Sequence, residues 1–265
     1  MDGWLSHDGI TKVDDKIYIL NSNPNRVKVY EDLNGGFTLI SDIELNGIGT
    51  PHDILYSNKS QRVYISDNTE QYIWIMTTAG EHRLTKWMAK ATWPYTLSLS
   101  NEGDFLLLRR QTPSQLLFFS WNVTRNRILN LPQDIIGAQH VVQKPTGNFI
   151  ILHRLDNATH GPVVISEVAY DGRLVNRFVP RNQLEELNRP HHLSLDSDKN
   201  RLFVTDYYNN RVILFDAYDL TWSQVLLCEE MNGIIRPYRL FYDASNNQLY
   251  VAQHFANVNV YELNH

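Results

Sequence analysis

The chain has 265 residues, of which 43% are hydrophobic and 20% charged, and its formal net charge at pH 7 is −5. This balance is typical of a folded globular protein and excludes a disordered one. The negative charge argues against a strongly basic nucleic-acid-binding protein, although it leaves room for a local basic patch.

A unit of about 43–52 residues recurs six times along the chain, which is the scale of a propeller blade. The opening strand of each unit is expected to begin near residues 8, 52, 95, 139, 191 and 238. Proline precedes four of these strands, a place where its missing N–H costs little. The four prolines are Pro51, Pro94, Pro190 and Pro237.

Each opening strand is followed by a turn with Asn, Asp, Gly, Pro or Ser, and then by a short apolar run typical of a buried strand. These runs span residues 17–20, 63–65, 105–108, 149–152, 202–204 and 249–251. A third strand is expected over residues 26–30, 72–76, 116–121, 163–168, 211–215 and 258–263. A more polar fourth strand is expected over residues 37–45, 83–88, 127–131, 174–179 and 221–227. Only residues 183–187 indicate a helical turn.

Four strands of decreasing hydrophobicity are typical of a propeller blade whose first strand lies nearest the axis. The sequence therefore predicts an all-β fold, a six-bladed β-propeller with four-stranded antiparallel blades, as a single domain over residues 1–265. The sixth unit ends at Leu263 without a fourth strand. Residues 3–5 are the only candidate for that strand, which would close the ring and remove an open sheet edge.

The fifth unit carries the clearest motif of the chain. It reads Pro-x-x-Leu-x-Leu-Asp over residues 190–196, Leu-Phe-Val-Thr-Asp over 202–206 and Asn-Asn-Arg-Val-x-x-Phe over 209–215. This pattern resembles the NHL repeat, and the resemblance implies a six-bladed propeller. The NHL-repeat family includes the TRIM-NHL proteins, which read ubiquitin-ligase substrates and RNA, and more distantly an amidating lyase, so the resemblance leaves the function open.

Equivalent positions of the six blades lie on circles around the axis, and two such circles carry polar residues. The first consists of Asp8, His52, Tyr95, Gln139, His191 and Tyr238, and the second of Gly9, Asp53, Thr96, His140, His192 and Arg239. Polar side chains here indicate either an ordinary water-filled channel or a ligand pocket. The candidate pocket residues are His52, Tyr95, Gln139, His140, His191, Tyr238 and Arg239.

A metal site is one interpretation of the axial histidines. His52 and His191 belong to the second and fifth blades and are expected to face each other, with His140 or Asp53 as a third ligand. Imidazole nitrogens are good zinc ligands. The amidating lyase that the chain resembles holds zinc with axial histidines. The alternate-blade positions here are His52, Gln139 and Tyr238, so two of the three positions are not histidine. No cofactor is predicted outright, and zinc or calcium in the central channel stays an open alternative.

A further ring is expected where the second strands end. Asp67 and Asp206 are expected to cap turns there. Arg109, Arg110, His153 and Arg154 place positive charge on two neighbouring blades and extend the candidate pocket, because paired arginines can bind a carboxylate or phosphate.

The preferred interpretation is a non-enzymatic propeller that binds a protein or peptide partner through one loop face, because a rigid ring presents variable loops well. No catalytic residue is assigned. The alternatives are an enzyme or a small-ligand or metal-binding propeller that uses the axial pocket, and an RNA-binding NHL domain.

The domain is expected to be monomeric, and no apolar run approaches the roughly 18 residues that cross a membrane. The compartment is open. It is cytoplasmic if Met1 is the natural start, and extracellular if the glycosylation sequons at Asn58, Asn122 and Asn157 are used.

Overall fold

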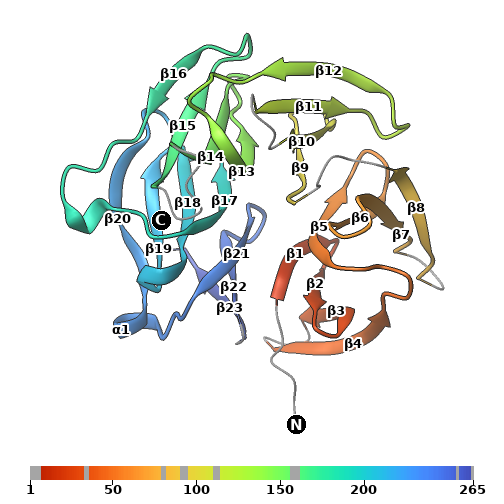
Figure 1. Cartoon of the computed structure of the whole chain (residues 1–265). Coiled ribbons are helices and arrows are strands. Elements are labelled where there is room, and N and C mark those ends of the chain that lie inside the picture. Colours follow the sequence, from red (N-terminus) through yellow and green to blue (C-terminus); the bar gives the residue numbers. More distant parts are fainter. Residues whose placement is uncertain are drawn as a thin grey trace.

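The computed structural model describes residues 7–32, 36–78, 82–89, 95–109, 114–155, 162–254 and 257–263. Within them the chain forms six antiparallel sheets that follow one another around a ring (Figure 1). The predicted all-β, six-bladed propeller is therefore confirmed.

The strands run outward from the axis in chain order within every sheet but differ in length. The first three blades consist of β1 (His7–Val13), β2 (Lys16–Ser22), β3 (Asn25–Asp32) and β4 (Phe37–Glu44); β5 (Pro51–Ser57), β6 (Arg62–Asp67), β7 (Tyr72–Met76) and β8 (Leu84–Ala89); and β9 (Ser98–Leu99), β10 (Phe105–Arg109), β11 (Gln115–Phe119) and β12 (Arg125–Asn130). The last three consist of β13 (Ile136–Gln143), β14 (Phe149–Arg154), β15 (Val163–Val168) and β16 (Leu174–Arg177); β17 (Pro190–Asp196), β18 (Arg201–Asp206), β19 (Arg211–Asp216) and β20 (Thr221–Cys228); and β21 (Pro237–Asp243), β22 (Gln248–Gln253) and β23 (Val258–Glu262).

The sixth sheet has three strands in the described part of the chain, in the order β21-β22-β23. Residues 3–5, the expected fourth strand, lie outside the described residues. The opening strand of the third blade is shorter than expected, because only Ser98 and Leu99 of β9 pair with β10. No helix of the described residues is long and apolar enough to cross a membrane.

In the part of the chain that the structure describes, helical structure is confined to the connections between strands. The predicted turn near residues 183–187 is a 3-10 helix, η1 (Gln183–Glu185), and the Asn182 side chain accepts a hydrogen bond from the Glu185 backbone N–H at its start. A second 3-10 helix, η2 (Tyr207–Asn209), and a single-turn helix, α1 (Glu229–Asn232), were not predicted. All three are too short for the sequence pattern to show a helical period.

The hydrophobic core lies between neighbouring blades, because each sheet is covered on both faces. The second strands are accordingly apolar at successive positions, as in β18, where Leu202, Phe203 and Val204 are fully buried. One such cluster joins the sixth blade to the first through Ile10, Ile17, Ile19, Tyr250 and Ala252. Side-chain packing therefore closes the ring where no peptide bond connects the blades.

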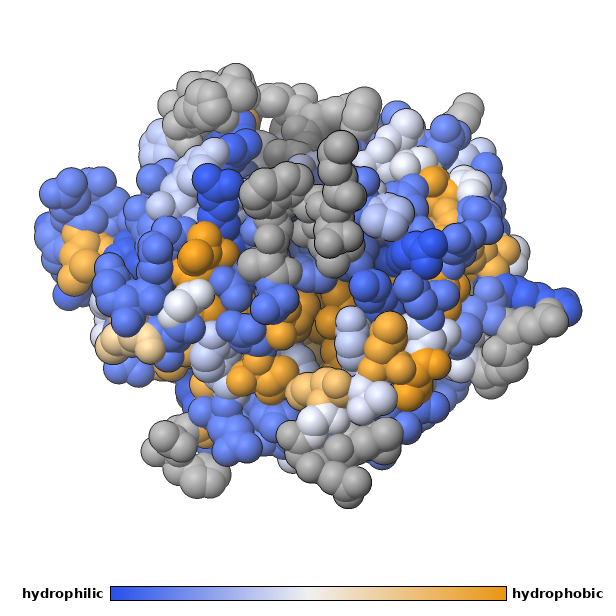
Figure 2. Space-filling model, turned by 90° about the horizontal axis from the view of Figure 1, so that it is seen from below, coloured by the Kyte–Doolittle hydropathy of each residue, from blue (hydrophilic) through white to orange (hydrophobic). Residues whose placement is uncertain are grey.

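A cavity of about 360 Å³ lies at this junction of the first and sixth blades. Its lining is mostly apolar and includes Ile17, Tyr30, Phe37, Val258 and Val260. Seen from below, the side on which β4 and β23 lie, apolar residues gather around a hollow in the surface (Figure 2). The outer strand β4 adds Phe37, Leu39 and Ile40 to the exposed apolar side chains of the protein.

Gly9 provides a test of the packing between the first two blades. A Cβ atom at Gly9 would lie 2.8 Å from the backbone nitrogen of Ile54 on β5, so one of the two inner strands would have to shift. We expect Gly9→Ala to lower the free energy of unfolding by about 1–3 kcal/mol, as overpacking does.

Gly36→Ala is the matched control, because no atom lies within 4 Å of its added Cβ. Its effect is expected to stay within about 0.5 kcal/mol. Chemical denaturation of both variants measures the difference, and equal stabilities would contradict the close packing of β1 on β5.

Candidate functional site

Four polar side chains form a layer across the propeller axis, here called the axial layer: Asp53, His140, His192 and Arg239. They come from the same position of the inner strands β5, β13, β17 and β21. Asp53, His140 and Arg239 are at most 3% exposed, and His192 is half-buried. The rings of His140 and His192 stack with their centroids 3.9 Å apart.

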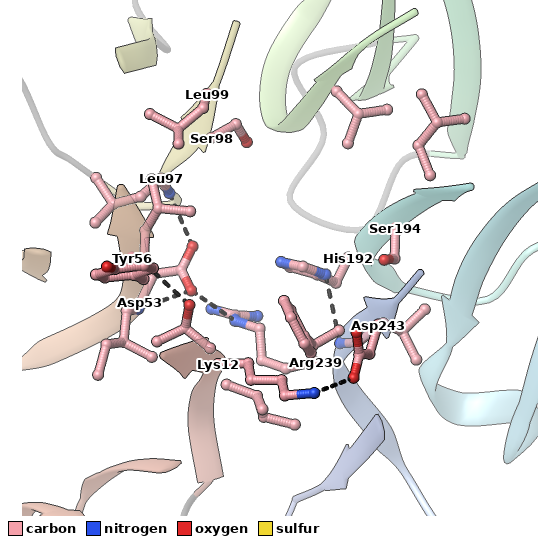
Figure 3. Close-up of a pocket in the computed structure, with 18 of the residues that line it drawn as sticks. Lys12, Asp53, Tyr56, Leu97, Ser98, Leu99, His192, Ser194, Arg239 and Asp243 are labelled. Atoms are coloured by element: carbon pink, nitrogen blue, oxygen red, sulfur yellow. Dashed lines mark hydrogen bonds and ion pairs between the residues drawn. The ribbon is translucent and has the colours of Figure 1, made fainter. Parts of the chain in front are cut away.

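Three members of the axial layer bind the backbone of the next blade. Each accepts a hydrogen bond from a backbone N–H of that blade. The donor is the residue that directly follows the aligned position there. The bonds are Leu97 N–H to Asp53 Oδ2 at 2.8 Å, Leu193 N–H to His140 Nδ1 at 3.2 Å, and Leu240 N–H to His192 Nδ1 at 3.4 Å. The axial layer thus links blades to one another as well as lining the channel (Figure 3).

Arg239 crosses from the sixth blade to the second. Its guanidinium donates to the His52 carbonyl at 2.9 Å and to His52 Nδ1 at 3.2 Å, and its Nε lies 3.9 Å from Asp53 Oδ1. The guanidinium carbon also lies 4.2 Å from the centre of the Tyr238 ring. The first blade, which stands between the two, carries Gly9 at this position and contributes no side chain.

Burial and the charge of Arg239 set the protonation of the axial layer. Burial lowers the pKa of His140 to about 3, and Arg239 adds to the effect. The pKa of His192 is also lowered, first by burial and then by the neighbouring His140 and Arg239. Burial raises the pKa of Asp53 to about 6, although Arg239 and two backbone N–H groups oppose the rise. Both histidines are therefore neutral at pH 7.

Asp53, His140 and His192 offer ligand atoms within 4.8 Å of one another, which raises the question of a metal ion. Both histidines accept a backbone N–H at Nδ1, so the proton of each neutral ring is on Nε2. Neither nitrogen then offers a free lone pair, and Arg239 already places a positive charge beside the carboxylate. The three residues do not fit a metal site.

The predicted metal ligands His52 and His191 lie elsewhere. His52 accepts from Arg239 and stacks on Tyr95 at 3.8 Å, while His191 contacts Tyr238 and Tyr207 with ring centroids 4.7 and 5.1 Å apart. Within the described ranges, neither belongs to a cluster of three potential ligands.

A cavity of about 830 Å³, here called the axial bowl, opens on the side of the axial layer where the inner strands end. The axial layer is its floor (Figure 3). Half-buried apolar side chains from five blades, here called the collar, form its wall: Leu55, Leu99, Val142, Leu195 and Phe241. Its rim consists of turns between first and second strands, with Asp14, Asp15, Asn58, Ser197, Ser245 and Asn246.

The axial bowl contains only two of the candidate pocket residues predicted from sequence, His140 and Arg239. His52, Gln139, His191 and Tyr238 precede the axial layer in their strands, and Tyr95 precedes it in the segment before β9, so all five lie on its other side. Here the Tyr207 hydroxyl and His254 Nδ1 are 2.6 Å apart, next to His191. Nothing in the repeat pattern indicates Tyr207 or His254, because both lie beyond the ends of second strands, outside the two circles.

The predicted basic ring is off the axis. His153 is fully buried, with Nε2 bound to Ser166 Oγ at 2.8 Å, and burial lowers its pKa to about 4. Arg109 donates to Gln115 Oε1 at 3.2 Å, and Arg154 ends β14. None of the three lines the axial bowl. Arg110 lies outside the described residues.

Asp67 and Asp206 bind the loops around them. Asp67 accepts from the backbone of Gly49, Thr50 and Glu70, and Asp206 accepts from Asn188 and pairs with Arg211 at 2.7 Å. Their carboxylates are thus parts of the scaffold.

Comparison with known proteins identifies the fold family. The model of the NHL repeat matches residues 187–215, which contain β17, β18 and most of β19. The chain is a six-bladed β-propeller that carries an NHL repeat in its fifth blade. No curated protein matches its sequence.

Solved structures similar to this NHL-repeat propeller show the same fold at low identity. Virginiamycin B lyase from Staphylococcus aureus is 14% identical, with a TM-score of 0.62 over 99% of this chain and 86% of that one. A chain of a nidogen/laminin complex is 16% identical, with a TM-score of 0.66 over 89% and 83%. Hydrazine synthase from Kuenenia stuttgartiensis is 15% identical, with a TM-score of 0.65 over 96% and 82%. Proteins with such different names leave the function to be argued from the site.

The neutral histidines make the stability of the NHL-repeat propeller dependent on pH. The pKa of His140 is about 3 in the folded chain, below the ordinary value of 6.5, so only the unfolded chain gains its proton as the pH falls below 6.5. His140 therefore lowers stability progressively between pH 6.5 and 3, by up to about 1.4 kcal/mol per pH unit.

His140→Asn removes this titration and keeps an acceptor, Oδ1, near the position of Nδ1. We expect the free energy of unfolding of the variant to fall less steeply between pH 6.5 and 5 than that of the wild type. Denaturant titrations at three pH values measure the slope. An unchanged slope would show that His140 is not held neutral by the fold.

Proposed function

We propose that this NHL-repeat propeller is a non-enzymatic binding protein that takes a segment of a protein or peptide partner at the face carrying the axial bowl. The observation that carries the proposal is a cavity of about 830 Å³ whose ionisable floor groups are already bound within the protein. The loop face recognises the partner, and the axial bowl accepts part of it.

The size and lining of the axial bowl suit recognition. Ligand sites are typically concave, about 300–1,000 Å³ in volume, and combine apolar surface with a few polar groups. Here the apolar surface is the collar, and Ser98, Ser194 and Asn246 are among the polar groups. The wall belongs to the rigid inner strands, so little ordering free energy opposes binding.

The floor is poorly suited to acid–base catalysis. A general base needs a lone pair within reach of the proton that it removes. Each oxygen of Asp53 keeps a second lone pair, but both already accept backbone N–H groups, from Ile54 at 2.9 Å and Leu97 at 2.8 Å, and Asp53 is only 3% exposed. The Nδ1 lone pairs of His140 and His192 are occupied in the same way. These commitments favour binding over catalysis in the axial bowl.

RNA binding has less support than peptide binding. The lining of the axial bowl includes four Asp but only one Lys and one Arg. Neutralisation of phosphates supplies much of the affinity for nucleic acid, and this lining has the wrong sign for it.

A reaction on the opposite side of the axial layer is the second candidate function. It is favoured by the hydrogen bond of 2.6 Å between the Tyr207 hydroxyl and His254 Nδ1, beside the half-buried His191. The similar structures named virginiamycin B lyase and streptogramin B lyase suggest the substrate to try. Conversion of virginiamycin B by the wild type but not by His254→Gln would replace the binding proposal with this one.

Blocking the axial bowl tests the binding proposal. Ser197 is exposed at its rim, so Ser197→Trp places an indole in the mouth without changing the buried core. Peptides selected from a random library on the full chain are expected to lose at least about tenfold in affinity, since a filled pocket removes their buried anchor.

Ser223→Trp is the matched control, because Ser223 is exposed on the outer strand β20, away from the axial bowl. Fluorescence-polarisation titrations compare the two variants with the wild type. Selected peptides that bind Ser197→Trp as tightly as Ser223→Trp would rule out the axial bowl as the site.

A further inference from the structure

Some charged side chains around the axial bowl form ion pairs, and others do not. Lys12 pairs with Asp243 in the wall, and Arg239 faces Asp53 in the floor. Asp14 and Asp15, on the turn between β1 and β2, are exposed at the rim, and no cation of the described chain forms an ion pair with either. The uncompensated negative charge of the axial bowl therefore lies at the rim of the first blade.

An aromatic side chain lines the axial bowl together with these carboxylates. Tyr56 of β5 is half-buried and lines the axial bowl (Figure 3). The charge of Asp14 reaches it, because Asp14 adds to the effect of burial in raising the pKa of Tyr56. Carboxylates and an aromatic ring both attract a cationic group.

The floor of the axial bowl, unlike the rim, does not favour a cation. Arg239 brings a buried positive charge to the bottom of the axial bowl, and His192 presents a neutral ring whose Nε2 carries the proton. A cation at this depth would be repelled, whereas a carbonyl oxygen could accept from His192 Nε2–H. Between floor and rim lies the apolar collar.

We propose that the axial bowl binds a basic amphipathic peptide segment, in which a Lys or Arg lies against Asp14, Asp15 and Tyr56 at the rim and neighbouring apolar side chains lie against the collar. This inference rests on the proposed function and adds to it the chemistry of the partner and the direction in which it enters. A backbone carbonyl of the segment faces His192.

The test is a selection from a random peptide library on the full chain, followed by affinity measurements on single peptides. We expect the selected set to be enriched in Lys or Arg next to Leu, Ile or Val, relative to the unselected library. Asp14→Asn combined with Asp15→Asn is expected to weaken these peptides roughly 3- to 10-fold, as the loss of two partly exposed ion pairs would. The difference is expected to shrink in 1 M salt, where charges are screened within about 3 Å.

The double asparagine variant is expected to keep the backbone conformation of the turn. Asp14 has φ of 51°, in the left-handed region that asparagine also tolerates well. The control is Glu229→Gln combined with Glu230→Gln on α1, which removes the same two charges from an exposed adjacent pair outside the axial bowl. These peptides are expected to bind this control as they bind the wild type.

The outcomes separate this inference from the proposed function. Peptides that are lost on Ser197→Trp but are not enriched in Lys or Arg, or that bind the Asn variant at full strength, overturn the inference and leave the proposed function standing. Peptides that are insensitive to Ser197→Trp, or a selection that yields no binder, overturn both.

Discussion

The structure depends on one constraint, the need to satisfy the backbone edge of each inner strand. An inner strand pairs with its own sheet on one side only, and its other edge faces the axis. Buried backbone N–H and C=O groups must find partners. The preceding blade supplies them through short polar side chains. Tyr56 N–H donates to Thr11 Oγ1 at 3.0 Å, Leu97 N–H to Asp53 at 2.8 Å, and Tyr242 N–H to Ser194 Oγ at 3.1 Å.

This constraint changes the meaning of the polar axis. Histidine, aspartate and arginine around a channel are the residue types of catalytic and metal sites, and here they are committed to holding blades together. His140 illustrates this best, because Nδ1 accepts from Leu193 in the next blade and Nε2 faces Ser98 Oγ of the preceding one at 3.3 Å. The proposed binding therefore uses the surfaces that this scaffold leaves available, the collar and rim of the axial bowl.

The repeat in the sequence predicts the fold and the alignment of equivalent residues, because burial repeats wherever the blade repeats. It placed Asp53, His140, His192 and Arg239 on one circle, and these are the residues of the axial layer. It could not predict that His52 and His191 lie across that layer from the cavity. The axial layer separates these histidines from the axial bowl because Arg239 reaches past the first blade to His52. The length of the Arg239 side chain and the absence of a side chain at Gly9 allow this contact, and neither follows from the repeat length. The collar was missed because single apolar residues in apolar strands look like ordinary core residues.

The junction of the sixth and first blades differs chemically from the others, and the difference bears on the partner. At this junction Lys12 of the first blade pairs with Asp243 of the sixth, and Arg239 reaches from the sixth blade past the first to Asp53 and His52 of the second. Asp14 follows Lys12 by two residues, so a ligand cation at the rim lies close to the ion pair that helps to close the ring. A ligand held by both the first blade and the collar of the other five binds only the closed ring. By mass action, such a ligand would stabilise the folded propeller by RT ln(1 + [L]/Kd), so the proposed recognition would be coupled to closure of the ring.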